Sequence, residues 1–114
     1  MHPQDIPTVR VDEIPSDAVL LDVREDDEWA AGHIAGAVHI PMNQVPQRLA
    51  YDPGPITPVA QIVVTCKVGG RSAQVTAWLR QQGYQAVNLE GGMLAWDGAG
   101  KPMQAEGGGP AQVA

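Results

Sequence analysis

Residues 61–72 decide the fold, and they read Gln61-Ile-Val-Val-Thr-Cys66-Lys-Val-Gly-Gly-Arg-Ser72. The run at 61–65 is rich in β-branched side chains, which predicts a strand buried on both faces. The two glycines that follow permit a tight loop. Apolar side chains then recur at helical spacing over 72–82, and Gly83 supplies a stop signal. A strand, a short glycine loop and a helix in this order are typical of an α/β domain.

The same alternation extends on both sides of this stretch. A short helix is expected from the acidic residues 25–28 to Gly32, because acidic residues favour a helix start and glycine favours its end. A second helix is expected over 42–51, which Pro46 breaks or shortens, and a last one from Gly91 to Trp96. Four further strands are expected at 8–11, 18–23, 37–40 and 86–89. This order predicts an α/β fold with a mainly parallel sheet covered by helices on both faces.

Length and composition predict one domain followed by a tail. The 114 residues fit a single compact unit, and a chain of this size can bury a core without disulfides or metal. Residues 98–114 turn to Gly, Pro, Ala and Gln, which is typical of a flexible segment. We therefore expect the folded domain to span 1–97 and the tail 98–114.

The charge of the chain excludes some partners. The formal net charge is −6 and the sequence pI is about 4.7. Nucleic acid and anionic membranes both reward a basic face, so neither is expected as a partner. A small anionic substrate stays open, because a small site can be locally positive inside an acidic protein.

A lone cysteine cannot form an internal disulfide, which favours a reducing compartment. No apolar run approaches the roughly 20 residues that span a bilayer. The first residues lack the basic and apolar pattern of a signal peptide. Together these features predict a cytoplasmic location.

Cys66 is the candidate reactive residue. It follows the predicted strand at its carboxyl end, where open α/β sheets bind ligands. Gly69 and Gly70 allow successive N–H groups to point inward as an anion-binding nest, and a helix N-terminus lies behind them. A thiol at such a nest should have a lowered pKa. Two alternatives remain from the residues alone, because a lone cysteine often serves as a small core side chain and such loops also bind phosphate.

Several motifs in register resemble the rhodanese family. They are Asp22-Val-Arg24-Glu25, Glu28-Trp29, Gly32-His33-Ile34, Gly36-Ala37, Ile40-Pro41, Cys66-x-x-Gly69-x-Arg71-Ser72 and Gly91-Gly92-x-x-Ala95-Trp96. The match runs from about residue 8 to residue 97. The resemblance implies a single rhodanese-like domain with a five-stranded parallel sheet, in which Cys66 accepts sulfur.

The same resemblance implies a two-step sulfur transfer that needs no cofactor. The Cys66 thiolate takes sulfur from a small anionic donor such as thiosulfate and becomes a persulfide. Cyanide, a thiol or an acceptor protein then removes the sulfur. Relatives active on thiosulfate often have a basic residue two places after the cysteine, where this chain has Val68. The expected substrate-binding residues are Lys67, Val68, Gly69, Gly70, Arg71 and Ser72.

Other readings of these residues remain. A binding module or sulfur carrier on the same fold would turn over little substrate. A cysteine phosphatase or arsenate reductase is disfavoured, because four residues separate Cys66 from Arg71 where phosphatases have five, and no second cysteine is present. Ser72 either caps the helix or donates to the thiolate, and capping is commoner.

Some conspicuous side chains have structural explanations. Asp22 and Arg24 stand at the end of a neighbouring strand and could face the same crevice. The family pattern implies a mainly structural, supporting role, with Asp22 accepting hydrogen bonds from backbone or arginine near the loop. His33 and His39 match no zinc pattern, so no metal site is expected. The acidic run at 25–28 is interpreted as a solvated helix start. The tryptophans are interpreted as packing residues.

Overall fold

The computed structural model describes residues 6–114 and contains one five-stranded parallel sheet. The strands lie in the order β1-β5-β4-β2-β3, and every pairing between them is parallel. The strands are β1 (Thr8–Val9), β2 (Val19–Asp22), β3 (Val38–His39), β4 (Gln61–Thr65) and β5 (Gln85–Leu89). The predicted fold class, an α/β domain with a five-stranded parallel sheet, is confirmed.

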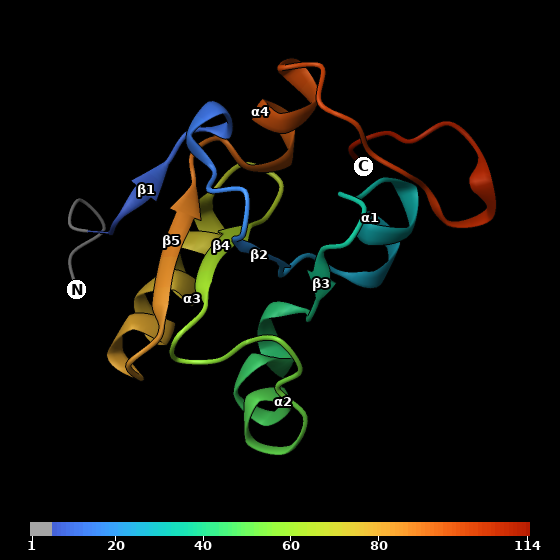
Figure 1. The fold of residues 1–114 in the computed structure, drawn as a ribbon. Coiled ribbons are helices and arrows are strands. Elements are labelled where there is room, and N and C mark those ends of the chain that lie inside the picture. The colour runs from blue at the N-terminus through green and yellow to red at the C-terminus, as the bar shows by residue number, and fades with distance from the viewer. Residues whose placement is uncertain (1–5) are drawn as a thin grey trace.

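Helices α1 (Asp26–Ala31), α2 (Val45–Tyr51) and α3 (Gly70–Gln81) connect β2, β3, β4 and β5 in turn, and α4 (Gly92–Gly98) follows β5. In Figure 1, α3 lies behind β4 and β5, and α4 lies beyond the end of the sheet where the arrowhead of β5 points. Short 3₁₀ turns at Val11–Glu13, Met42–Gln44 and Glu106–Gly108 were not expected from the sequence. None of the helices that the structure describes is long and apolar enough to cross a membrane.

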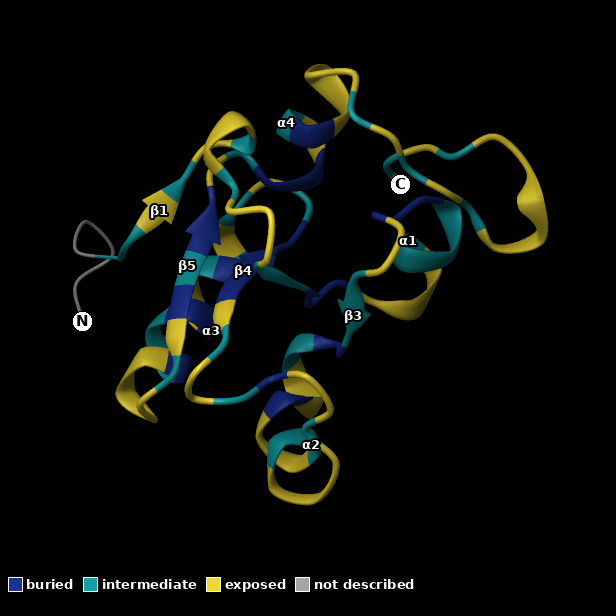
Figure 2. Ribbon diagram, viewed as in Figure 1, coloured by how far each residue is buried: buried dark blue, intermediate teal, exposed yellow. Residues whose placement is uncertain are grey.

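Alternate side chains of the strands belong to two different apolar clusters, one on each face of the sheet. Leu21 of β2 belongs to a cluster with Val75 and Leu79 of α3, whereas the neighbouring Leu20 packs against a second cluster that contains Met93 of α4. Because successive side chains of a strand point to opposite faces, both faces of the sheet are covered. Figure 2 shows the central strands β4 and β5 as largely buried.

Two helix starts differ from the sequence predictions. The helix expected over 42–51 is shortened, as one of the two alternatives for Pro46 predicted: α2 begins at Val45 after a 3₁₀ turn, with Pro46 in its first turn. Proline is tolerated there because the first N–H groups of a helix have no partner within it. Helix α3 begins at Gly70, two residues before the predicted start, with Gly69 in the left-handed region at φ 110° as its N-cap. The expectation that Ser72 caps this helix is therefore wrong.

Residues 98–114 make specific contacts with the domain. His33 and Gln104 form an antiparallel bridge, with the N–H of each 2.8–2.9 Å from the other's carbonyl oxygen. The Gln112 N–H donates to Ala31 at the end of α1, and Met103 and Val113 pack on the cluster of Met93. Figure 1 shows this segment returning beside α1. That residues 98–114 form a flexible tail stays a prediction, and these contacts argue against it.

Candidate functional site

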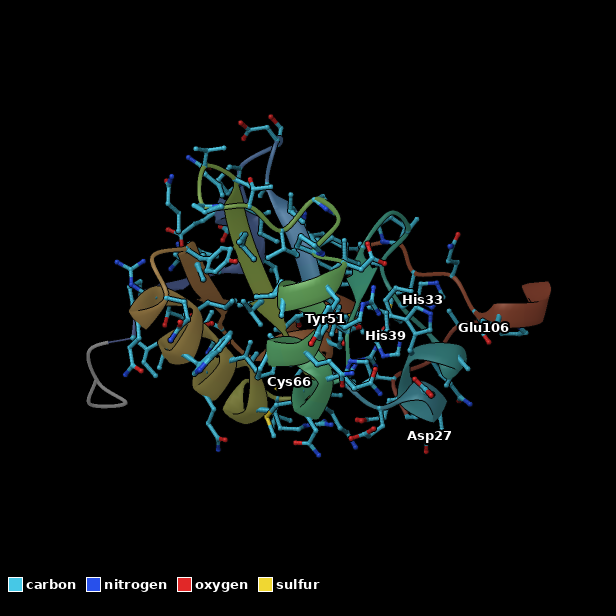
Figure 3. The ribbon with its side chains drawn as sticks, turned by 90° about the horizontal axis from the view of Figure 1, so that it is seen from below. Asp27, His33, His39, Tyr51, Cys66 and Glu106 are labelled. Carbon is cyan, nitrogen blue, oxygen red and sulfur yellow. The ribbon has the colours of Figure 1, made fainter. Side chains whose placement is uncertain are left out.

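Cys66 directly follows β4, at the carboxyl edge of the sheet where β4 lies beside β2. Asp22 is in register with Thr65, and the Val23 N–H donates to the Thr65 carbonyl at 3.0 Å. Parallel strands bring their carboxyl ends to one edge, which is why the thiol lies beside the end of β2. We call residues 66–71 the cysteine loop. Figure 3 shows Cys66 beside the first turns of α3.

Two donors of this region point at the Cys66 sulfur. The Gly69 N–H lies 3.1 Å from Sγ, and the Ser72 hydroxyl donates to Sγ at 3.3 Å. Both come from the start of α3, where backbone N–H groups carry partial positive charge. The residue is only 1% exposed. A substrate must therefore present a slender terminal atom to the sulfur, unless the loop moves.

These contacts control the acidity of the thiol. Burial raises the pKa of Cys66, because an apolar environment disfavours the charged form. Hydrogen bonds from Ser72, Gly69 and Val68 lower it, and together they outweigh burial. The pKa of Cys66 therefore lies below its ordinary value. A lowered pKa provides more of the nucleophilic thiolate near neutral pH.

The N-terminus of α4 holds the cysteine loop from the other side. The Met93 N–H donates to the Cys66 carbonyl at 2.8 Å, and the Leu94 N–H donates to the Lys67 carbonyl at 3.1 Å. This close approach requires Gly92, whose φ is 56° and whose missing Cβ would collide with the Cys66 carbonyl oxygen. The backbone of α4 therefore fixes the first half of the loop.

The Arg71 side chain is engaged by Glu28 of α1 and not by the thiol. Its guanidinium forms two hydrogen bonds with Glu28 of α1, at 2.7 and 2.9 Å. The hydrogen bond from Arg71 holds the pKa of Glu28 at about 2, below its usual value near 4.5. Glu28 in turn raises the pKa of Arg71. Arg71 thus braces the end of the cysteine loop against α1.

Three other predicted site residues take different positions. Lys67 is half-buried, and no side-chain hydrogen bond or ion pair is found for it among residues 6–114. Val68 is 60% exposed at the tip of the loop. Gly70 is the first residue of α3 and has open space where a Cβ would lie. The loop therefore presents one cation and one apolar side chain outward.

Asp22 and Arg24 form a buried pair beside this site. Arg24 Nη2 lies 2.7 Å from Asp22 Oδ2 and also donates to the Gly32 carbonyl at 2.7 Å. Both side chains are essentially inaccessible to solvent. A buried charge is stable only when it is paired, and this pair also anchors the end of α1. Among residues 6–114, neither side chain forms a hydrogen bond with the Cys66 sulfur, so the contacts of this pair are structural.

The rings of His33 and His39 both stack on the ring of Trp29. The centroid of Trp29 lies 3.8 Å from that of His33 and 4.6 Å from that of His39, with nearly parallel planes. Figure 3 places both histidines beside α1, away from Cys66. Within residues 6–114, no group of three His, Cys, Asp or Glu side chains is arranged to hold a metal ion. These rings pack and hydrogen-bond to backbone carbonyls.

Sequence reasoning missed two residues of this site. The interpretation of 25–28 as solvated is wrong for Glu28, whose side chain is 16% exposed because Arg71 draws it inward. Asn88 of β5 donates from Nδ2 to the Gly69 carbonyl at 3.2 Å. Its Oδ1 is buried without a partner in the described residues. The sequence signal that could have identified Asn88 as a site residue is its polar amide within the otherwise apolar run 86–89.

Comparison with known proteins agrees with this architecture. The model of the rhodanese-like domain matches residues 10–99. The protein YtwF of Bacillus subtilis is 41% identical over 90 residues, which cover 79% of this chain and 84% of YtwF. A sulfurtransferase of Allochromatium vinosum is 39% identical over 90 residues, covering 78% and 80% of the two chains.

A solved structure extends the comparison to three dimensions. The rhodanese-like domain protein of Staphylococcus aureus superposes with a TM-score of 0.72 at 31% identity. The match covers 94% of this chain and all of that one. Taken with the cysteine loop at the carboxyl edge of a five-stranded parallel sheet, these matches show that the chain belongs to the rhodanese-like family of sulfurtransferases.

Proposed function

We propose that this protein moves sulfane sulfur from a small donor to a thiophilic acceptor through a persulfide on Cys66. The observation that carries the proposal is the pair of donors on Sγ, the Gly69 N–H and the Ser72 hydroxyl. They favour the thiolate that begins the reaction, and they remain close enough to stabilise the same sulfur when it becomes a leaving group.

With thiosulfate as donor, the Cys66 thiolate attacks the outer sulfur. A bond forms between Sγ and that sulfur, the sulfur–sulfur bond of thiosulfate breaks, and its electron pair leaves with sulfite. The cysteine then carries a persulfide anion, so the total charge is unchanged. In the second step cyanide or a thiolate attacks the outer sulfur, the Sγ–S bond breaks, and the electron pair returns to Sγ. This exchange is a ping-pong reaction.

The cysteine loop divides its tasks between backbone and side chains. The N–H groups from Val68 to Ser72 would face the negative charge, in the manner of an oxyanion hole. Lys67 would draw an anionic donor toward the loop, whereas Arg71 would act through its brace to Glu28. Since the thiol must remain reduced between turnovers, we also propose a cytoplasmic location and a small thiol or an acceptor protein as the partner.

Mass spectrometry of the intact protein tests the proposal. Treatment with thiosulfate should add one sulfur, about 32 Da, because the chain has one thiol available for covalent catalysis. Cyanide should then remove the adduct and yield thiocyanate. Cys66→Ser should abolish both steps, while Ser72→Ala should slow them without abolishing them.

Each outcome separates one reading from another. No adduct with thiosulfate or with several organic persulfides, alongside a thiol pKa near that of free cysteine, would overturn the proposal. An adduct that forms but is not released to cyanide or thiols would favour a sulfur carrier without turnover. Hydrolysis of p-nitrophenyl phosphate that depends on Cys66 would favour the phosphatase reading.

A further inference from the structure

A cavity of about 200 Å³ lies between α2 and the first turns of α3. The residues around it come from the turn after β3, from α2 and from one face of α3, and all but one are apolar. They are Met42, Val45, Pro46, Gln74, Val75 and Trp78. Small-molecule sites are typically concave, largely apolar and equipped with few polar groups, as this one is.

The cavity is continuous with the packing around the reactive sulfur. Val45 and Val75 belong to the same buried cluster as Cys66, and Met42 and Trp78 pack against that cluster. Along α3, Val75 follows three residues after Ser72, so it lies on the same face about one turn from the hydroxyl that donates to Sγ. Val75 therefore belongs both to the wall of the cavity and to the apolar cluster that contains the thiol.

The wall of the cavity opposite α3 includes Met42, which lies at the carboxyl edge of the sheet. The Met42 N–H donates to the Val23 carbonyl at 3.0 Å, and the Val23 N–H donates to Thr65, the residue before Cys66. Met42 is thus separated from the position of Cys66 by a single strand. Met42 and Cys66 follow strands at the same edge of the sheet, on either side of the end of β2.

The lining of the cavity favours an apolar occupant over an ionic one. Both nearby guanidinium groups are engaged in ion pairs, Arg71 with Glu28 and Arg24 with Asp22. The side chain that the loop exposes most is Val68. Among the described residues that line the cavity, none is charged. A polar or anionic group placed there would lose its hydration without gaining a partner.

We propose that this cavity binds the hydrocarbon group of an organic thiol that accepts sulfur from Cys66. The proposal rests on the proposed sulfurtransferase function and names its acceptor class. The acceptor thiolate attacks the outer sulfur of the Cys66 persulfide, and a sulfur–sulfur bond forms. The Sγ–S bond breaks, and its electron pair returns to Sγ, which Gly69 and Ser72 hold by hydrogen bonds. The products are the organic persulfide and the free thiolate of Cys66.

A series of alkyl thiols tests the cavity in the unmodified protein. Cys66 is loaded with sulfur, the donor is removed, and loss of the adduct is followed with ethanethiol, propanethiol, butanethiol and pentanethiol. The second-order rate constant should rise about two- to fourfold per added methylene, the gain from burying one CH₂, until the cavity is full. Mercaptopropionate should react more slowly than butanethiol at equal thiolate concentration, because its carboxylate cannot be solvated in the cavity.

Cyanide, which has no hydrocarbon group, provides the internal reference for variants. Trp78→Ala should lower the ratio of the butanethiol rate constant to the cyanide rate constant about tenfold, and Trp78→Phe should retain most of that ratio. Val59→Ala is the control, since Val59 is an exposed apolar residue outside the cavity. Thermal unfolding of each variant checks that it is folded.

The failure of this inference is distinguishable from failure of the proposed function. If Cys66 forms no persulfide, the sulfurtransferase proposal fails. If the persulfide forms and cyanide removes it, but thiol rates are independent of chain length, the cavity proposal is overturned. The same holds if chain-length dependence survives unchanged in a folded Trp78→Ala variant. The wild-type series keeps the test decisive even if that variant does not fold.

Discussion

Arg71 and Glu28 form a doubly hydrogen-bonded ion pair that joins the end of the cysteine loop to α1, with Nη1 2.7 Å from Oε1 and Nη2 2.9 Å from Oε2. The two residues are 43 positions apart in the chain. Planar pairs of this kind fix orientation as well as distance. The position of the loop's last residue is therefore set by α1.

Glu28→Gln should make the free energy of unfolding depend less on pH in the acidic range. The pKa of Glu28 is lowered from about 4.5 to about 2 in the folded protein. The stabilisation that this carboxylate provides is present above pH 4.5 and is lost as the pH falls toward 2. Allowing for solvent screening, we expect the variant to lose about 1–2 kcal/mol at pH 7. Urea unfolding between pH 2 and 7 measures this, with the exposed Glu106→Gln as control.

Ser72→Ala should raise the pKa of the Cys66 thiol. The Ser72 hydroxyl contributes the largest of the hydrogen bonds that lower this pKa. A hydrogen bond to a charged group contributes roughly 1.5–3 kcal/mol, so its loss should raise the pKa of the thiol measurably. The pH dependence of alkylation by iodoacetamide gives the pKa directly. Thr76→Val is the control: it removes a buried hydroxyl of the same helix that has no partner in the described residues. It should leave the pH dependence of alkylation unchanged.

Asn88→Leu should also shift the thiol's pH profile, through the backbone. Asn88 donates to the Gly69 carbonyl, and the Gly69 N–H donates to Sγ. Without the amide, the glycine loses one of two donors on its carbonyl, the other being Ala73. We expect the pKa of Cys66 to rise, by less than in Ser72→Ala, because the lost hydrogen bond joins two neutral groups and acts on the sulfur only through Gly69. An unchanged profile in a variant of reduced stability would assign Asn88 a purely structural role.

Gly92→Ala should disrupt the cysteine loop. A Cβ at this position would collide with the carbonyl oxygens of Cys66 and Lys67, and its φ of 56° is unfavourable for alanine. We expect a loss of at least about 2 kcal/mol in unfolding free energy, together with slower alkylation of Cys66. Gly98→Ala in the same helix meets no neighbouring atom and should be tolerated. Equal stability of the two variants would contradict this packing.

The segment 98–114 should show protected amides if its contacts persist in solution. Hydrogen exchange at His33, Gln104 and Gln112 reports on three of the hydrogen bonds that join the segment to the domain. A chain ending at Gly100 should lose roughly 1–3 kcal/mol of stability, because Met103 and Val113 would no longer cover apolar surface. Exchange as fast as in a free peptide would instead support the flexible tail that composition predicts.

Most of the secondary structure could be predicted because its signals are local. The apolar run at 61–65 coincides with β4, since a strand buried on both faces needs no polar alternation. The start of α3 was misplaced by two residues, because Gly70 has no intrinsic helical preference and is drawn into the helix by the hydrogen bond from Ala73 to Gly69. Boundaries of this kind depend on contacts that no sequence window contains.

The sequence by itself determined the order of strands and helices, the single thiol and its place after a strand and before a glycine loop. It also limited the chemistry, since a single cysteine excludes a disulfide within the chain. Only the tertiary structure decided which groups touch the sulfur and which do not. Arg71 is occupied by Glu28, Asn88 orients Gly69, and α2 and α3 enclose an apolar cavity. These relationships join residues distant in the chain, so they arise from packing and not from local propensity.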